Sequence, residues 1–138
     1  MPSYNYKKTI DDIAKEYNVA FFAYFGSYQT EYYHKESDID IAFLPEKNMT
    51  IETKVSLMDD LIKYHRKSEI DLLDLRKAEP VLRYEIALNG RVFYEKHAGL
   101  FDKYSLFYIK RFYELKPLIE AELSAITKDI KEVLKSAR

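Results

Sequence analysis

The sequence predicts an α/β fold of the α+β kind, in which a small mixed β-sheet is flanked by helices and followed by a C-terminal helical pair. Two observations lead to this prediction. Short apolar runs with the length and composition of strands occur at residues 19–25, 38–44, 69–75 and 91–95. Longer segments alternate with these runs and carry apolar residues at helical spacing, as in residues 51–66.

The composition fits one packed domain. The chain has 138 residues, of which 47% are hydrophobic, and a formal net charge of -1. This charge argues against a general nucleic-acid binder, which would present a strongly basic face. The absence of cysteine excludes disulfides and thiolate metal sites. Neither a membrane-length apolar run nor a signal-peptide pattern is present, so we expect a cytoplasmic protein.

The expected elements have recognisable boundaries. In order they are a helix at 3–17, a strand at 19–25, a short polar helix at 28–37, a strand at 38–44, a helix at 51–66, a strand at 69–75, a helix at 77–89, an edge strand at 91–95, and helices at 100–116 and 118–135. Thr50 can cap the helix that follows it, Pro80 is tolerated in a first turn, and Gly90 suits a C-terminal cap. Pro117 is expected to break the C-terminal helix in two.

The two C-terminal helices differ in their apolar patterns. Residues 100–116 contain too many aromatic residues for one narrow stripe, which indicates two covered sides. For this segment, packing on its own domain and docking of a partner remain equally open. In residues 118–135 the apolar positions 119, 123, 126, 130 and 133 alternate steps of four and three, as in a helix-packing seam. We expect this second segment to pack on its own domain.

A glycine–serine turn and a pair of aspartates carry the chemistry of the sequence. Gly26 and Ser27 end the first strand, where glycine permits a sharp turn and Ser27 could contact a phosphate. After ten intervening residues come Asp38 and Asp40, which lie two positions apart and so project from the same face of a strand. Adjacent carboxylates repel each other, and Mg²⁺, which prefers oxygen ligands, would compensate their charge.

This pattern resembles the Gly-Ser-x10-Asp-x-Asp signature of the DNA polymerase β-like nucleotidyltransferases, and it is closest to their minimal nucleotidyltransferase (MNT) branch. The resemblance implies the fold of that superfamily. It implies that Gly26 and Ser27 bind nucleotide phosphates and that Asp38 and Asp40 are catalytic ligands of Mg²⁺, in a site for two ions. The sequence after Ser27 lacks the small or basic residues that many relatives carry there.

The family also has a third carboxylate, on a neighbouring strand that faces the aspartate pair. Asp71 fits this place and would complete the metal site and help to deprotonate the acceptor hydroxyl. Glu69 shares its face of the strand and is the reserve candidate. Asp74 would face the opposite side, as a turn or cap residue.

The resemblance covers nearly the whole chain and implies a function. Residues 1–98 would form the minimal nucleotidyltransferase domain, and residues 99–138 a C-terminal helical extension packed on it. The MNT family includes antitoxins encoded beside HEPN-domain toxin ribonucleases. For such a type VII-like antitoxin, resemblance implies that AMP is transferred from ATP to a tyrosine hydroxyl of the HEPN toxin, which is inactivated within a hetero-oligomeric complex.

Two other functions remain open. The protein could neutralise its partner by binding alone, although a pure binder has no need for a repulsive carboxylate pair. It could also transfer a nucleotide to a small molecule, as aminoglycoside nucleotidyltransferases with this motif do. Those enzymes usually carry a larger substrate-binding domain, so the short length disfavours this reading.

Overall fold

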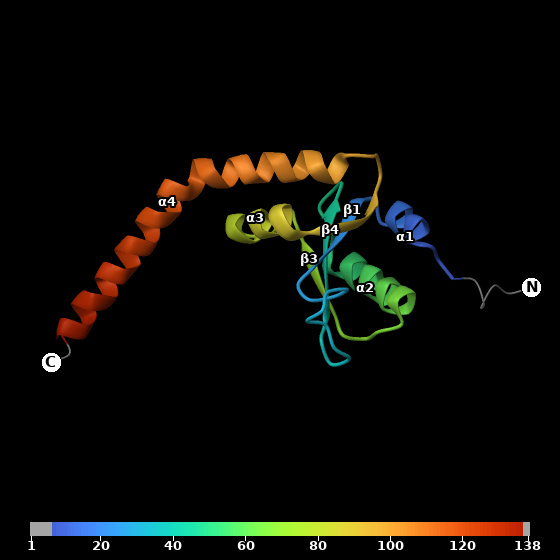
Figure 1. Cartoon of the computed structure of the whole chain (residues 1–138), viewed down its shortest axis with the longest axis horizontal. Helices are drawn as coiled ribbons and strands as arrows, with labels where there is room; N and C mark the ends of the chain where they lie inside the picture. Colours follow the sequence, from blue (N-terminus) through green and yellow to red (C-terminus); the bar gives the residue numbers. More distant parts are fainter. Residues whose placement is uncertain (1–6, 137–138) are drawn as a thin grey trace, which may run out of the picture.

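A computed structural model describes residues 7–136 of the chain. It contains the four strands that the sequence predicts, together with four helices in place of the six expected (Figure 1). In chain order they are α1 (Ile10–Glu16), β1 (Val19–Phe25), β2 (Ile39–Pro45), α2 (Ile51–His65), β3 (Ile70–Asp74), α3 (Pro80–Asn89), β4 (Arg91–Glu95) and α4 (Leu100–Ser136). Within this part of the chain, no helix is both long enough and apolar enough to cross a membrane.

The four strands form one mixed sheet with the order β3-β2-β1-β4. Strand β1 is antiparallel to both of its neighbours, whereas β2 and β3 are parallel. The first six residues of β1 are buried, which explains why its sequence is an unbroken apolar run. Strand β4 lies at an edge, as predicted.

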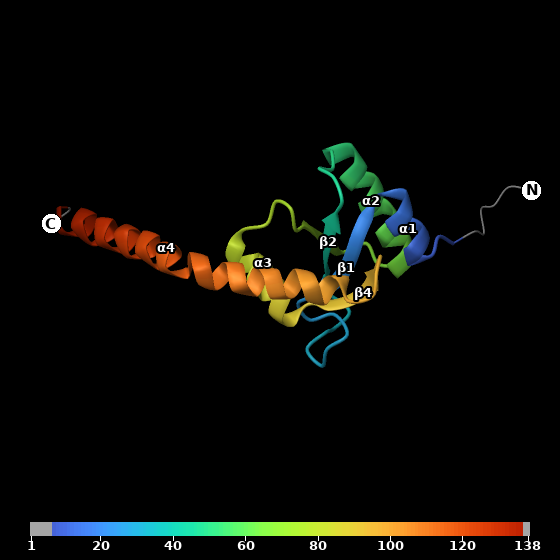
Figure 2. The same ribbon diagram turned by 90° about the horizontal axis from the view of Figure 1, so that it is seen from above.

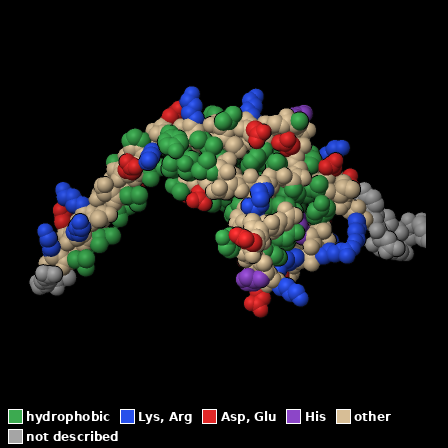
Figure 3. Space-filling model, in the orientation of Figure 1, with side chains coloured by type: hydrophobic (Ala, Val, Ile, Leu, Met, Phe, Trp, Pro, Cys, Tyr) green, Lys and Arg blue, Asp and Glu red, His purple; other side chains and the backbone are tan. Residues whose placement is uncertain are grey.

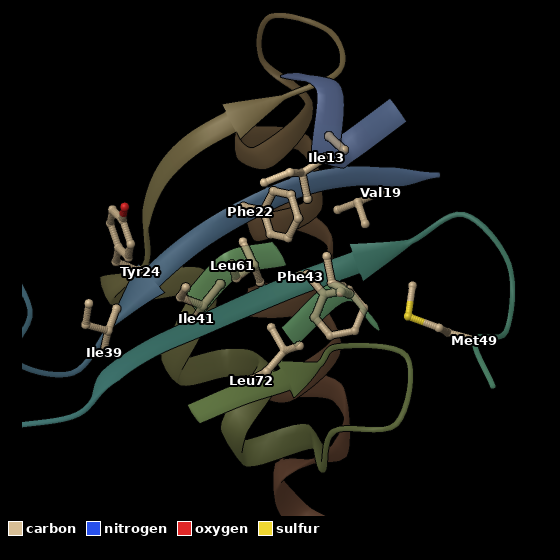
Figure 4. Close-up of a cluster of buried hydrophobic side chains, with 12 residues drawn as sticks. Ile13, Val19, Phe22, Tyr24, Ile39, Ile41, Phe43, Met49, Leu61 and Leu72 are labelled. Atoms are coloured by element: carbon tan, nitrogen blue, oxygen red, sulfur yellow. The ribbon is translucent and has the colours of Figure 1, made fainter. Parts of the chain in front are cut away.

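Helices cover both faces of the sheet. Alternation along β1 sends Phe22 into a core shared with α1 and α2, and Phe21 into a second core under α3 and the start of α4. Figure 4 shows the first core, in which Phe22, Ile41 and Phe43 lie among side chains from the helices. Burial of each such side chain contributes about 1.5–3 kcal/mol. The two cores fix the sheet from both sides and leave its strand ends free to carry a site.

Capping residues set where the helices begin. The hydroxyl of Thr9 accepts a hydrogen bond from the Asp12 amide, so α1 starts at Ile10, and residues 7–9 of the expected helix are not helical. Residues 3–6 of that prediction lie outside the described part. The predicted cap at Thr50 is confirmed. Helix α3 starts three residues later than expected because Glu79 precedes a proline and is held in an extended conformation.

The predicted helix at 28–37 is wrong. This segment is a series of turns, in which the amides of Thr30, Tyr33 and Ser37 each bond to a carbonyl three residues back. Side-chain hydroxyls take part as well, since Thr30 donates to the Ser27 carbonyl and Ser37 accepts from the His34 amide. Such local bonds compete with the helical pattern. We call residues 26–37 the site loop.

The predicted break of the C-terminal helix at Pro117 is also wrong. Helix α4 runs for 37 residues with Pro117 inside it, and it bends near its middle (Figures 1 and 2). A proline in a helix removes one backbone hydrogen bond and causes a bend without always ending the helix. The bend separates a first half that lies along α3 from a second half that extends away from the body.

Only one side of the first half of α4 is covered. Phe101 and Tyr104 are buried against Phe21, whereas Leu106 and Phe107 are exposed, so the expectation of two covered sides is not met. The expectation that residues 118–135 pack on their own domain is wrong, because the apolar side chains of this half are more than half exposed at residues 118, 123, 126, 130, 133 and 134. The domain division at residue 98 stays a prediction.

Candidate active site

The pairing of β1 with β2 brings the glycine turn against the aspartate motif. Phe25, the last residue of β1, lies opposite Asp40 in the antiparallel register. The next residue, Gly26, has a φ of +69°, a left-handed conformation that glycine adopts without strain. A Cβ atom at this position would overlap the Asp40 carboxylate. The side chain of Asp40 therefore lies directly against the backbone of the turn.

The parallel pairing of β2 with β3 adds a third carboxylate. Asp40 and Asp71 are opposite each other in the register of the two strands, so they project from the same face of the sheet. Asp38 lies just before β2 and is exposed. Partial burial raises the pKa of Asp40, and the negative charges of Asp71 and Asp38 raise it further. Asp40 is thus close enough to both Asp71 and Asp38 for their charges to act on it.

The other two carboxylates considered for the third position are occupied elsewhere. Glu69 lies 3.7 Å from Lys67 in an ion pair at the surface. Hydrogen bonds, the first from its own backbone amide, lower the pKa of Glu69. Asp74 is buried and accepts a hydrogen bond of 2.9 Å from the Arg76 amide, which is the turn role expected for it. The geometry therefore favours Asp71 over Glu69.

The carboxylate group suits a cation that is shared with a substrate. Within residues 7–136, no Lys, Arg or His forms an ion pair with Asp38, Asp40 or Asp71, so their charges are not compensated by the described side chains. The same part of the chain contains no ready-made cluster of three or more potential metal ligands. Mg²⁺ commonly binds one or two carboxylates together with substrate phosphates, and this donor set fits that mode.

Arg91 supports the turn and was not singled out from the sequence. Its guanidinium Nη2 donates to the carbonyls of Gly26, at 3.0 Å, and Tyr28, at 2.8 Å. Arg91 is the first residue of β4, which lies beside β1, so the edge strand clamps the turn that follows β1. The signal available in the sequence was a single cation at the start of the edge strand, directly before the apolar residues Val92 and Phe93.

Further contacts hold the rest of the site loop. Lys67 donates to the Lys35 carbonyl at 2.8 Å, and Tyr28 packs edge-on against Tyr24, with ring centroids 4.7 Å apart. The Tyr24 hydroxyl lies 2.8 Å from His65 Nε2, while His65 Nδ1 lies 2.9 Å from the Leu61 carbonyl. Because a carbonyl can only accept, Nδ1 carries the proton. Burial lowers the pKa of His65, so this ring is neutral and structural.

Comparisons with known proteins bear on the family and the fold of the chain. The family model described as "Polymerase beta, Nucleotidyltransferase" matches residues 8–98. No curated protein matches the chain significantly.

Several solved structures have the same fold. A chain from a toxin–antitoxin with AMP-PNP is 22% identical to this protein, with a TM-score of 0.71. The match covers 86% of this chain and 95% of that chain. A second match is a chain from the complex of a tri-AMPylated Shewanella oneidensis HEPN toxin with MNT antitoxin. It is also 22% identical to this protein, with a TM-score of 0.66, and the match covers 86% of this chain and 92% of that chain. A toxin–antitoxin named MntA-HepT is 20% identical, with a TM-score of 0.65 and coverages of 86% and 93%.

The family match spans every element from α1 to β4, including the turn and all three aspartates. The fold seen in the solved structures extends this likeness into α4. The chain belongs to the polymerase beta nucleotidyltransferase family.

Proposed function

We propose that this protein is a Mg²⁺-dependent protein adenylyltransferase that acts as an antitoxin. It transfers AMP from ATP to a tyrosine hydroxyl of a partner HEPN toxin ribonuclease and so inactivates it. The observation that carries the proposal is the position of Asp40, against Gly26 and beside Asp71. Support also comes from the family match and from the similar structures of toxin–antitoxin complexes, one with AMP-PNP and one with a tri-AMPylated HEPN toxin. A cytoplasmic location, where ATP is available, goes with this function.

Each residue of the site has a role in this reaction. Gly26 and Ser27 bind phosphate oxygens of ATP through backbone amides and the serine hydroxyl. Asp38 and Asp40 would hold Mg²⁺, which would supply positive charge to neutralise the phosphates. Asp71 completes this donor set.

The transfer step itself is a displacement at the α-phosphorus. The tyrosine oxygen forms a bond to the α-phosphorus while the bond to the pyrophosphate leaving group breaks. Asp71 takes the proton of the attacking hydroxyl. The protein contributes mainly position and charge to this step.

The test is the intact mass of the partner toxin after co-expression with this protein. We expect a gain of one or more AMP units with the wild-type chain and with Asp59→Asn, which removes an exposed carboxylate on α2 away from the site. We expect no gain with Asp38→Asn. A stable complex with unchanged toxin mass, or full neutralisation of the toxin by an Asp38→Asn/Asp40→Asn variant, would contradict transfer and favour neutralisation by binding alone.

A further inference from the structure

The second half of α4 presents a continuous apolar stripe to solvent. We call it the α4 seam, and it consists of Ile119, Leu123, Ile126, Ile130 and Val133. The last four of these side chains are 55–66% exposed. In Figure 3, hydrophobic side chains gather along the side of this helical arm that faces the body, whereas lysines lie on its outer side. Soluble proteins rarely leave such a patch uncovered, which marks it as a binding surface.

The spacing of the seam specifies what kind of surface covers it. Its residues follow one another by steps of four, three, four and three, which is the spacing of the core positions of a coiled coil. Four consecutive steps keep the stripe straight along more than three helical turns. A helix from another chain, packed along the arm, would cover it over this whole length.

The charged residues beside the α4 seam indicate which kind of partner helix would bind there. Glu122 and Asp129 each precede a seam residue by one position and therefore border the stripe on one side. Neither makes an ion pair with any residue in 7–136. On the other border, Glu120 follows Ile119 and lies 4.0 Å from Lys116, whereas Thr127 and Leu134 are uncharged.

A second copy of the chain is a poor binding partner for the α4 seam. In an antiparallel pairing, Glu122 of one copy would face Asp129 of the other, and these like charges repel. In a parallel pairing, the acidic residues would face Thr127 and Leu134, so they would remain uncompensated. An anionic membrane surface would also be repelled by the acidic border.

We propose that the α4 seam binds a helix of a different protein, whose apolar stripe is bordered by Lys or Arg residues that face Glu122 and Asp129. This surface is separate from the carboxylate site, and its occupancy does not depend on the transfer reaction.

Two synthetic helical peptides test the proposal on the full-length protein. Both carry the same Leu and Ile stripe with coiled-coil spacing, and they differ only in having Lys or Glu at the bordering positions. Like charges at the borders disfavour self-pairing of either peptide. By fluorescence anisotropy we expect the Lys-bordered peptide to bind at least about tenfold more tightly than the Glu-bordered peptide. Equal affinities, or tighter binding of the Glu-bordered peptide, would overturn the proposal.

Variants of the chain make the test specific to the seam. Ile126→Asp should abolish peptide binding, whereas Ser124→Asp, on the outer side of the same helix, should retain it. Glu122→Lys/Asp129→Lys should reverse the preference between the two peptides. Circular dichroism checks that each variant keeps its helix content, and a variant that loses helix is replaced by Ile130→Asp.

Two further measurements test whether a second copy of the chain or a membrane binds the α4 seam instead. Sedimentation of the protein alone should show a monomer, and binding to vesicles of phosphatidylglycerol should be absent. A dimer or vesicle binding that Ile126→Asp abolishes would assign the seam to a second copy or to a membrane, and would overturn the proposal.

Discussion

Gly26 is subject to two separate constraints, its left-handed backbone and its contact with Asp40. Gly99 provides a matched comparison, because its φ of +83° is also left-handed but a Cβ there would meet open space. An alanine in this conformation costs about 1–2 kcal/mol through strain alone. We expect Gly99→Ala to lose about this much free energy of unfolding in urea, with transfer activity unchanged.

Gly26→Ala should lose more, because the added methyl group must also displace the Asp40 carboxylate. It should lose transfer activity as well, since the displaced carboxylate is the one placed against the turn. Equal losses of stability in the two variants, with activity kept in both, would show that the close contact at Gly26 is not present in solution.

Asp40 gives a prediction about pH. Burial and the neighbouring carboxylates raise the pKa of Asp40 in the folded state, so folding disfavours its charged form. The charge on Asp40 therefore lowers the stability of the folded state at pH values above the pKa that Asp40 has in the folded protein. This loss of stability vanishes below the pKa that Asp40 has in the unfolded chain, where both states are protonated. Asp40→Asn should therefore raise the free energy of unfolding at about pH 7 but not at about pH 3.

The same substitution should lower the rate of transfer by at least about a hundredfold, since it removes one of the carboxylates proposed to hold Mg²⁺. Denaturant unfolding at the two pH values, combined with a transfer assay, checks both expectations. A stabilisation that persists unchanged at the lower pH would mean that repulsion and burial of the charge are not its cause.

At the scale of elements, the clamp between β4 and the site loop can be tested through Arg91. Arg91→Met removes both hydrogen bonds to the carbonyls of Gly26 and Tyr28 and leaves those carbonyls without this donor. Because the turn would then be less well positioned, we expect the KM for ATP to rise by about tenfold, with a smaller change in kcat. Arg91→Lys keeps a donor and should recover part of the loss.

The control for Arg91 lies at the other end of the same strand. Lys96 follows β4 and pairs with Glu46 at the surface, away from the site loop. Lys96→Met should leave both kinetic constants unchanged. If Lys96→Met and Arg91→Met altered the KM equally, the effect would reflect general damage to the edge strand.

The elements that the sequence predicts correctly are those whose signals are local. The apolar run of β1 and the cap at Thr50 depend on residues within the element itself. The predicted start of α1 was wrong, although its capping residues Thr9 and Asp12 are also local. The residues before Thr9 are compatible with a helix, so the sequence pattern did not mark Thr9 as the first boundary. The site loop was misread because its turns depend on hydroxyl groups and on anchors from Lys67 and Arg91, which are distant in sequence.

At the scale of the whole molecule, the candidate site could be predicted from spacing but its assembly could not. The motif identifies the turn and the aspartate pair, whereas the choice of Asp71 depends on which strands are neighbours and on their register. The path of α4 shows the same limit. Its apolar positions at coiled-coil spacing indicate that the helix packs against something, but the spacing does not say whether the partner surface belongs to the same chain.

The exposure of the second half of α4 leads to a prediction for the whole fold. Its apolar side chains lie largely in solvent, so they contribute little to the stability of the body. Removal of the residues after Pro117 should leave the free energy of unfolding within about 0.5 kcal/mol of the full-length value, as for a change at an exposed surface. Phe101→Ala, by contrast, opens a cavity beside Phe21 in the second core and should cost about 3–5 kcal/mol. Urea denaturation of the shortened chain, the Phe101 variant and the intact protein separates these contributions. A large loss on shortening would mean that the arm folds back on the body in solution, and the α4 seam would then be part of the core instead of a surface for another chain.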